Sequence, residues 1–162
     1  MPAFVPVPSK SAVLGAGTVL SIGAVTGSTG TETFVPIGEL TDFKFDGFKR
    51  ETAQNTNFDS GQVRTDLGTI LDYGTLTGTY NRVSSNAGQL ALIAALQATG
   101  GNAYDFKLQL PVNALQSQLT TGDSYTISGI VTEAGSFDIS QTKVSTTSFS
   151  IKINSLTFTA GA

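Results

Sequence analysis

The C-terminal part of the chain alternates regularly between two kinds of side chain. Residues 147, 149, 151 and 153 are Thr, Phe, Ile and Ile, whereas even positions from 146 to 154 carry small polar groups or lysine. Because side chains of a β-strand alternate between its two faces, this pattern predicts a strand between a core and water. A similar alternation recurs in residues 75–81 and 124–132.

A fourth alternating segment carries charge. In residues 41–46, the side chains of Asp42, Lys44 and Asp46 alternate with threonine and phenylalanine, and the Asp46-Gly47 dipeptide favours a tight turn. Four such segments predict a sheet with one wet face that is rich in hydroxyl groups.

One helix is predicted over residues 86–96. Its start has three candidate capping residues, Ser84, Ser85 and Asn86, and a Gly-Gly pair at 100–101 provides a left-handed stop. We expect the apolar stripe of this helix to cover a sheet face.

The helix should also have a polar side, which we expect to carry Gln89 and Gln97. Further strands are expected at residues 18–22 and 104–110. These elements predict a mainly β fold, a two-sheet β-sandwich or partial barrel with one short helix.

The domain organisation is simple. Residues 1–16 contain three prolines and are expected to form an extended N-terminal arm, and residues 17–162 are expected to form a single β domain. Residues 53–61 lack alternation and are predicted to be a long loop.

The composition argues against several functions. The chain has 9 basic and 12 acidic residues and a net charge of −3, so it lacks the basic stripe of a protein that grips duplex DNA. It also has no cysteine and no histidine. These absences remove the thiolate nucleophile and the commonest proton shuttle and metal ligand. No apolar stretch reaches the length that crosses a membrane.

Candidate enzyme motifs are weak. Acidic pairs such as Asp42 with Asp46 or Asp66 with Asp72 are better explained as solvated strand edges and turns than as glycosidase carboxylates. The chain has no phosphate loop and no complete calcium loop. We therefore predict a protein that is not an enzyme and that needs no cofactor or metal.

The order of the segments resembles the major tail tube protein of long-tailed bacteriophages. The similarity begins near residue 18, includes the turn at residues 35–42, the strand at 74–81 and the alanine- and leucine-rich helix at 86–96, and ends with the long last strand. The turn before the helix carries Ser84-Ser85 where the family is expected to have an acidic residue.

This resemblance implies a structural protein of the virion tail, made in the host cytoplasm. It implies hexameric rings that stack into a tube, with each subunit giving strands to a β-barrel that continues across subunits. It also implies a tape-measure protein, a tail terminator and tail-tip proteins as partners, and DNA that passes through during ejection without specific binding. Closing a barrel across subunits removes exposed strand edges, and open-ended stacking makes a filament.

On this reading, the wet face of the sheet lines the channel. The residues predicted to face the lumen are Asp42, Lys44, Asp46, Thr75, Thr77, Thr79, Thr126, Ser128, Thr146, Ser148, Ser150, Lys152 and Asn154. The N-terminal arm and the loop at 53–61 are predicted to contact neighbouring subunits, so deletion of residues 1–8 should leave a folded monomer that assembles poorly. The contact residues named from these segments are Pro2, Phe4, Pro6, Pro8, Asn55, Asn57, Phe58 and Asp59.

Two alternatives remain open from the sequence. One is a secreted or capsid-decorating β-sandwich that binds carbohydrate or protein through its loops. The other is the inner tube of a contractile tail or secretion device, which would have the same barrel and an outer sheath as partner.

Overall fold

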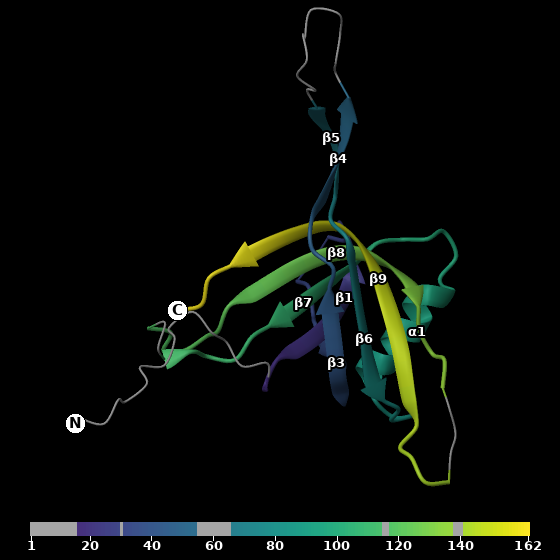
Figure 1. The fold of residues 1–162 in the computed structure, drawn as a ribbon. Helices are drawn as coiled ribbons and strands as arrows, with labels where there is room; N and C mark the ends of the chain where they lie inside the picture. Colours follow the sequence, from purple (N-terminus) through teal and green to yellow (C-terminus); the bar gives the residue numbers. More distant parts are fainter. Residues whose placement is uncertain (1–15, 30, 55–65, 115–116, 138–140) are drawn as a thin grey trace, which may run out of the picture.

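A computed structural model describes residues 16–29, 31–54, 66–114, 117–137 and 141–162 of the chain. Its main body is a seven-stranded antiparallel sheet with the strand order β2-β1-β7-β8-β9-β6-β3 (Figure 1). The strands of this sheet are β1 (Val19–Val25), β2 (Val35–Pro36), β3 (Leu40–Phe45), β6 (Thr75–Asn81), β7 (Tyr104–Gln109), β8 (Ser124–Glu133) and β9 (Thr146–Thr159). The mainly β fold with one short helix is therefore confirmed.

The core lies on one face of this sheet. Odd-numbered residues of β9 from Thr147 to Ile153 are buried, and even-numbered residues between them are exposed or half-buried, as the alternation predicts. The ring of Phe149 stacks on that of Tyr80 in β6, with 6.1 Å between the ring centroids. Phe106 of β7 and Ile127 of β8 extend the same core across the sheet.

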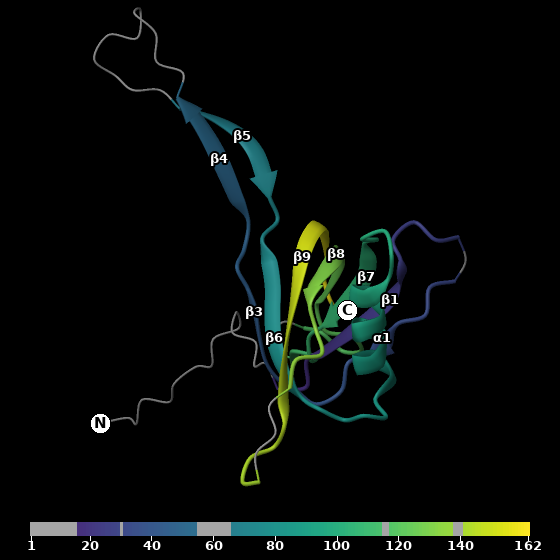
Figure 2. The ribbon, with the colours of Figure 1, turned by 90° about the vertical axis from the view of Figure 1, so that its right-hand side faces the viewer.

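The helix α1 (Ala87–Gln97) covers part of the core face and contacts β1, β2 and β8 (Figure 2). Of the three candidate capping residues, Asn86 is the one whose side chain accepts a hydrogen bond from the backbone N–H of Gln89. Leu92 and Ala95 face the core. Packing is close, because a Cβ atom added to Gly88 would collide with the carbonyl oxygen of Pro36.

The expected polar side of the helix was partly wrong. Gln97 is exposed, but Gln89 is only 3% exposed, whereas Leu90 is 52% exposed. The side chain of Gln89 accepts a hydrogen bond from the Val83 N–H and donates to the carbonyl oxygens of Gly38 and Asn81. A buried amide with backbone partners is stable, and hydropathy alone does not reveal it.

The second sheet is a hairpin of β4 (Lys49–Gln54) and β5 (Asp66–Asp72), which projects away from the seven-stranded sheet (Figures 1 and 2). The prediction of a loop from residue 53 was wrong at its start, since Ala53 and Gln54 pair with Leu67 and Asp66. The remainder of that predicted loop, 55–61, lies outside the described residues, as does the N-terminal arm up to residue 15.

Candidate functional site

The face of the large sheet opposite the core is polar. We call it the polar face and define it by the residues predicted to face a lumen, all of which are exposed or half-buried. The strand register brings them into rows across β3, β6 and β9. One row joins Lys44, Thr77 and Ser150, and a neighbouring row joins Asp42, Thr79 and Ser148.

The rows continue from β9 onto β8. In the second half of β9, however, odd-numbered instead of even-numbered residues lie on the polar face. Gly129 pairs with Ile153, whereas Ser128 pairs with Ser155, so a β-bulge at Asn154 shifts the register by one residue. Beyond the bulge, odd-numbered residues of β9 share the face of Ser128 and Thr126. Sequence reasoning therefore missed Ser155 and Thr157, which lie beside these two residues of β8.

Strand β7 also contributes to the polar face, which sequence reasoning did not anticipate. Asp105 pairs with Ser128 and Lys107 with Thr126, while Phe106 between them is fully buried. The hydroxyl of Thr26 donates to Asp105 at 2.6 Å. The alternation of charged and apolar residues in 104–109 was the signal that could have identified this strand as part of the face.

The polar face carries charges of both signs, with a small excess of carboxylates. Asp42, Asp46, Asp105 and Glu133 place carboxylates on it, and Glu133 pairs with Ser150 and accepts a hydrogen bond from the Ser148 hydroxyl. Lys44 and Lys107 supply amines, whereas the amine of Lys152 is already paired with Asp72. The Nζ of Lys44 lies 3.2 Å from the carboxylate of Asp46. The remaining groups across the strands are mostly small hydroxyls, so the face is wet and only slightly negative.

The hairpin is joined to this face through a short connection, which we call the neck and define as residues 46–48 and 73–74. The ring of Phe48 makes edge contacts with Phe45 and Tyr73, each with 5.6 Å between centroids. A Cβ atom on Gly74 would collide with the carbonyl oxygen of Gly47, so the two chain segments are in close contact. Phe45, Phe48 and Tyr73 therefore pack together at the neck.

An ion pair links the neck to the polar face. The Nζ of Lys152 in β9 donates to the carboxylate of Asp72 at 2.6 Å, and the Gly74 N–H donates to the same oxygen at 2.8 Å. The hydrogen bond from Lys152 is the main reason why the pKa of Asp72 is lowered, and the bond from Gly74 adds to it.

The hairpin exposes apolar side chains that the rest of the molecule does not cover. Leu67 is 56% exposed and Ile70 is 69% exposed. An isolated two-stranded hairpin is marginally stable in water, so this element gains most by contact with another surface. The four predicted contact residues nearest to it, Asn55, Asn57, Phe58 and Asp59, lie outside the described residues, as do Pro2, Phe4, Pro6 and Pro8.

Other types of site are poorly supported. Among the described residues, no cluster of acidic side chains has the arrangement that would hold a metal ion. In the same part of the chain, none of the helices is long and apolar enough to cross a membrane.

Comparison with known proteins gives matches in structure. No family model matches the sequence, and none of the curated proteins matches it either. The solved structure of the SPP1 tail tube is similar, with a TM-score of 0.63 at 13% identity, covering 92% of this chain and 80% of that one. The tail of an empty GTA particle with C6 symmetry has a TM-score of 0.63 at 18% identity, covering 92% of this chain and 100% of that one.

A third match comes from an extracellular contractile injection system. A chain of the PVC sheath-tube complex in its extended state has a TM-score of 0.64 at 10% identity, and the similarity covers 93% of both chains. At these identities the comparisons show a shared fold, and this fold extends over nearly the whole chain.

Proposed function

We propose that this chain is the structural subunit of a phage-type tail tube, which forms rings that stack into a hollow filament. The observation that carries the proposal is a wet face, rich in small hydroxyl groups, that crosses five strands of an otherwise well-packed sheet. The fold shared with chains of tail tubes and of an injection-system tube supports it. Neither a catalytic role nor a cofactor is part of this proposal.

The polar face is proposed to line the channel. Strands β3 and β2 end the large sheet, and within the described residues each has one side without a strand partner. Pairing of such edges between neighbouring subunits would close a barrel and remove an aggregation hazard. A hexameric ring is supported by the C6 symmetry of the similar GTA tail.

The hairpin is proposed to contact a neighbouring subunit, together with the segment 55–61 and the N-terminal arm. Leu67 and Ile70 supply the apolar area for this contact.

The proposed partners are further copies of this chain, a tape-measure protein inside the tube, and terminator and tip proteins at its ends. A chain of the PVC sheath/tube terminator shares the fold, with a TM-score of 0.62. The proposed location is the virion tail, after synthesis in the host cytoplasm, and DNA is proposed to pass without specific binding.

Electron microscopy of the purified full-length chain tests the main proposal. Rings or tubes with a central channel are the expected result, and monodisperse monomers at all concentrations would contradict it and favour a β-sandwich binding module.

The hairpin contact is tested by Leu67→Glu, which places a charge on the exposed apolar side of the hairpin. We expect this variant to fold and to lose stacking of rings, because burying an unpaired carboxylate in a contact is unfavourable. Thr52→Glu is the matched control, since Thr52 pairs with Gly68 and so lies on the other face of the hairpin. Equal tube formation by both variants would show that the contact lies elsewhere.

A contractile version of the same function is the second candidate. The match to a chain of the PVC sheath-tube complex is the observation that favours it. Assembled tubes that bind a sheath protein encoded beside this chain would support the contractile version, and tubes that remain bare in particles would support the simple tail.

A further inference from the structure

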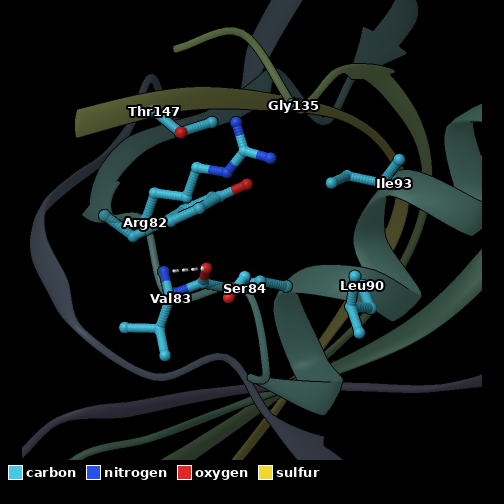
Figure 3. Close-up of a pocket in the computed structure, with 9 residues that line it drawn as sticks. Arg82, Val83, Ser84, Leu90, Ile93, Gly135 and Thr147 are labelled. Atoms are coloured by element: carbon cyan, nitrogen blue, oxygen red, sulfur yellow. Dashed lines mark hydrogen bonds between the residues drawn. The ribbon is translucent and has the colours of Figure 1, made fainter. Parts of the chain in front are cut away.

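A small pocket lies on the core side of the sheet, between α1 and the strands β6 and β9 (Figure 3). Its volume is about 70 Å³. Leu90 and Ile93 of α1 form one wall, and Arg82 and Thr147 lie on the opposite side. A single water molecule needs roughly 10–15 Å³ of the same kind of cavity volume, so the pocket has room for a group larger than one water.

Two buried hydroxyl groups lie near each other in this pocket, and neither makes a hydrogen bond of good geometry. Tyr80 is 1% exposed and Thr147 is 2% exposed, and neither hydroxyl oxygen has a partner of acceptable geometry within the protein. A buried hydroxyl without a well-formed hydrogen bond is unfavourable, so a group that accepts hydrogen bonds from both would bind favourably. Gln89 is not that group, because its N–H groups donate to Gly38 and Asn81, its oxygen accepts from Val83, and neither hydroxyl bonds to it.

Arg82 gives the pocket a positive charge. Its guanidinium carbon lies 4.2 Å from the centroid of the Phe137 ring, and stacking of this kind leaves the N–H groups at the guanidinium edge available. The Arg82 backbone N–H donates to the Ser145 carbonyl oxygen at 2.9 Å, which anchors the residue. No carboxylate lines the pocket.

The hydroxyl of Tyr80 remains a donor at neutral pH. Burial raises its pKa, while Thr147, the Gly135 backbone and the charge of Arg82 act in the opposite direction. Tyr80, Thr147, Arg82 and Gly135 all line the same small pocket. The side chains of the first three can each donate a hydrogen bond, and that of Arg82 also carries positive charge.

We propose that this pocket binds a carboxylate group. The carboxylate would accept hydrogen bonds from the hydroxyls of Tyr80 and Thr147 and pair with the guanidinium of Arg82, while Leu90 and Ile93 contact its apolar stem. The group has two sources of the same chemistry, a small free carboxylate or an acidic side chain from a second copy of this chain. The second source rests on the proposed tube.

Titration of the isotope-labelled full-length chain with acetate tests the site by NMR, with chloride at equal ionic strength as the reference. We expect saturable shifts of the Gly135 and Ser84 amides with acetate and not with chloride. Arg82→Gln should weaken acetate binding at least tenfold. Tyr80→Phe should also weaken it, while keeping the ring that stacks on Phe149.

Two variants outside the pocket serve as matched controls. Arg50→Gln removes an arginine from the hairpin and Tyr73→Phe removes a hydroxyl from the neck, and both should bind acetate as the unmodified chain does. The proposal is overturned if acetate gives no saturable shift, which would mean that only water fills the pocket. It is also overturned if Arg82→Gln binds acetate with unchanged affinity.

Assembled tubes distinguish the two sources of the carboxylate. If a neighbouring subunit supplies it, tubes should fail to take up ¹³C-acetate in solid-state NMR and Arg82→Gln should assemble poorly. If the source is a free carboxylate, tubes should bind acetate as the dispersed chain does and the variant should assemble normally. If the chain forms no tubes at all, the acetate titration of the dispersed chain still tests the pocket. The proposal of a carboxylate pocket and the proposal of a tube can therefore fail independently.

Discussion

Lys152 belongs to two parts of the molecule. Its strand position places it on the polar face, where Thr75 is its neighbour in β6, and its amine reaches Asp72 at the root of the hairpin. Its charge is therefore already paired within the subunit, and the side chain fixes the neck rather than standing free on the face.

This ion pair should respond to acid. The pKa of Asp72 is lowered from its ordinary value of 3.8, chiefly by the hydrogen bond from Lys152. A lowered pKa means that the stabilisation is fully present above pH 3.8 and is lost as the pH falls through the lower value of the folded state. In the Asp72→Asn variant, the backbone amides of β5 should exchange hydrogen with solvent faster than in the unmodified chain at pH 7. The difference between the two exchange rates should vanish in strong acid.

The matched control for this variant is Lys44→Gln, which breaks the other ion pair between described residues of the polar face. Since Lys44 is well exposed and its strand β3 pairs with β6 and not with β5, its loss should leave that exchange unchanged. Equal protection of β5 in Asp72→Asn and in the unmodified chain would show that the aromatic contacts alone hold the neck.

Gly74 allows a second test at the residue scale. Its φ is 80°, and that of Gly27 is 83°, but only at Gly74 would an added Cβ collide with a backbone atom. Left-handed backbone strain is worth about 1–2 kcal/mol for a residue other than glycine. Gly74→Ala should lower the free energy of unfolding in urea by more than Gly27→Ala, and the excess measures the close contact with Gly47. Equal losses would mean that the neck can open to admit a methyl group.

At the scale of elements, α1 sets two effects against each other. Replacing a helical glycine by alanine ordinarily stabilises by roughly 0.5–1 kcal/mol, but Gly88 packs directly against the backbone of Pro36. Gly88→Ala should therefore lower the melting temperature, because the helix must move away from β2. Ala94→Gly, at an exposed helical position, is the control for propensity alone. A rise in melting temperature for Gly88→Ala would show that this contact is easily relieved.

The elements also show what the sequence could reveal. Strands β6 and β9 were predictable because each buries one face, and alternation is the direct consequence of that burial. All residues of β4 are exposed, so no such pattern marks the hairpin. The bulge at Asn154 does leave a trace, since the apolar positions change from odd numbers, at Ile151 and Ile153, to even numbers at Leu156 and Phe158. The predicted lining stops at Asn154 and did not use this change.

For the whole molecule, the small excess of carboxylates on the polar face should keep the proposed tube from binding duplex DNA. Asp42→Lys combined with Asp46→Lys would add cations to a wet face, so folding and assembly should persist. Phosphate neutralisation releases counterions, so the variant tubes should hold duplex DNA roughly tenfold or more tightly at low salt, with affinity falling as salt rises. Binding by assembled tubes across a salt series measures this.

The control at this scale is Asp42→Asn with Asp46→Asn, which removes the carboxylates without adding cations. If this pair binds DNA as tightly as the lysine variant, repulsion by carboxylates rather than attraction by cations sets the affinity. If the lysine variant shows no salt-dependent binding of DNA, then DNA does not reach this face in the assembled tube.

The exposed hairpin has one more consequence, which concerns timing. Only the base of the hairpin packs within its own subunit, so its outer part should gain order when a neighbour arrives, and that entropic cost falls on the first encounters between subunits. Growth should then begin slowly and accelerate once short stacks exist, and preformed tubes added as seeds should abolish the delay. The same feature that leaves Leu67 and Ile70 in water would keep the free subunit from polymerising before an initiating complex is ready.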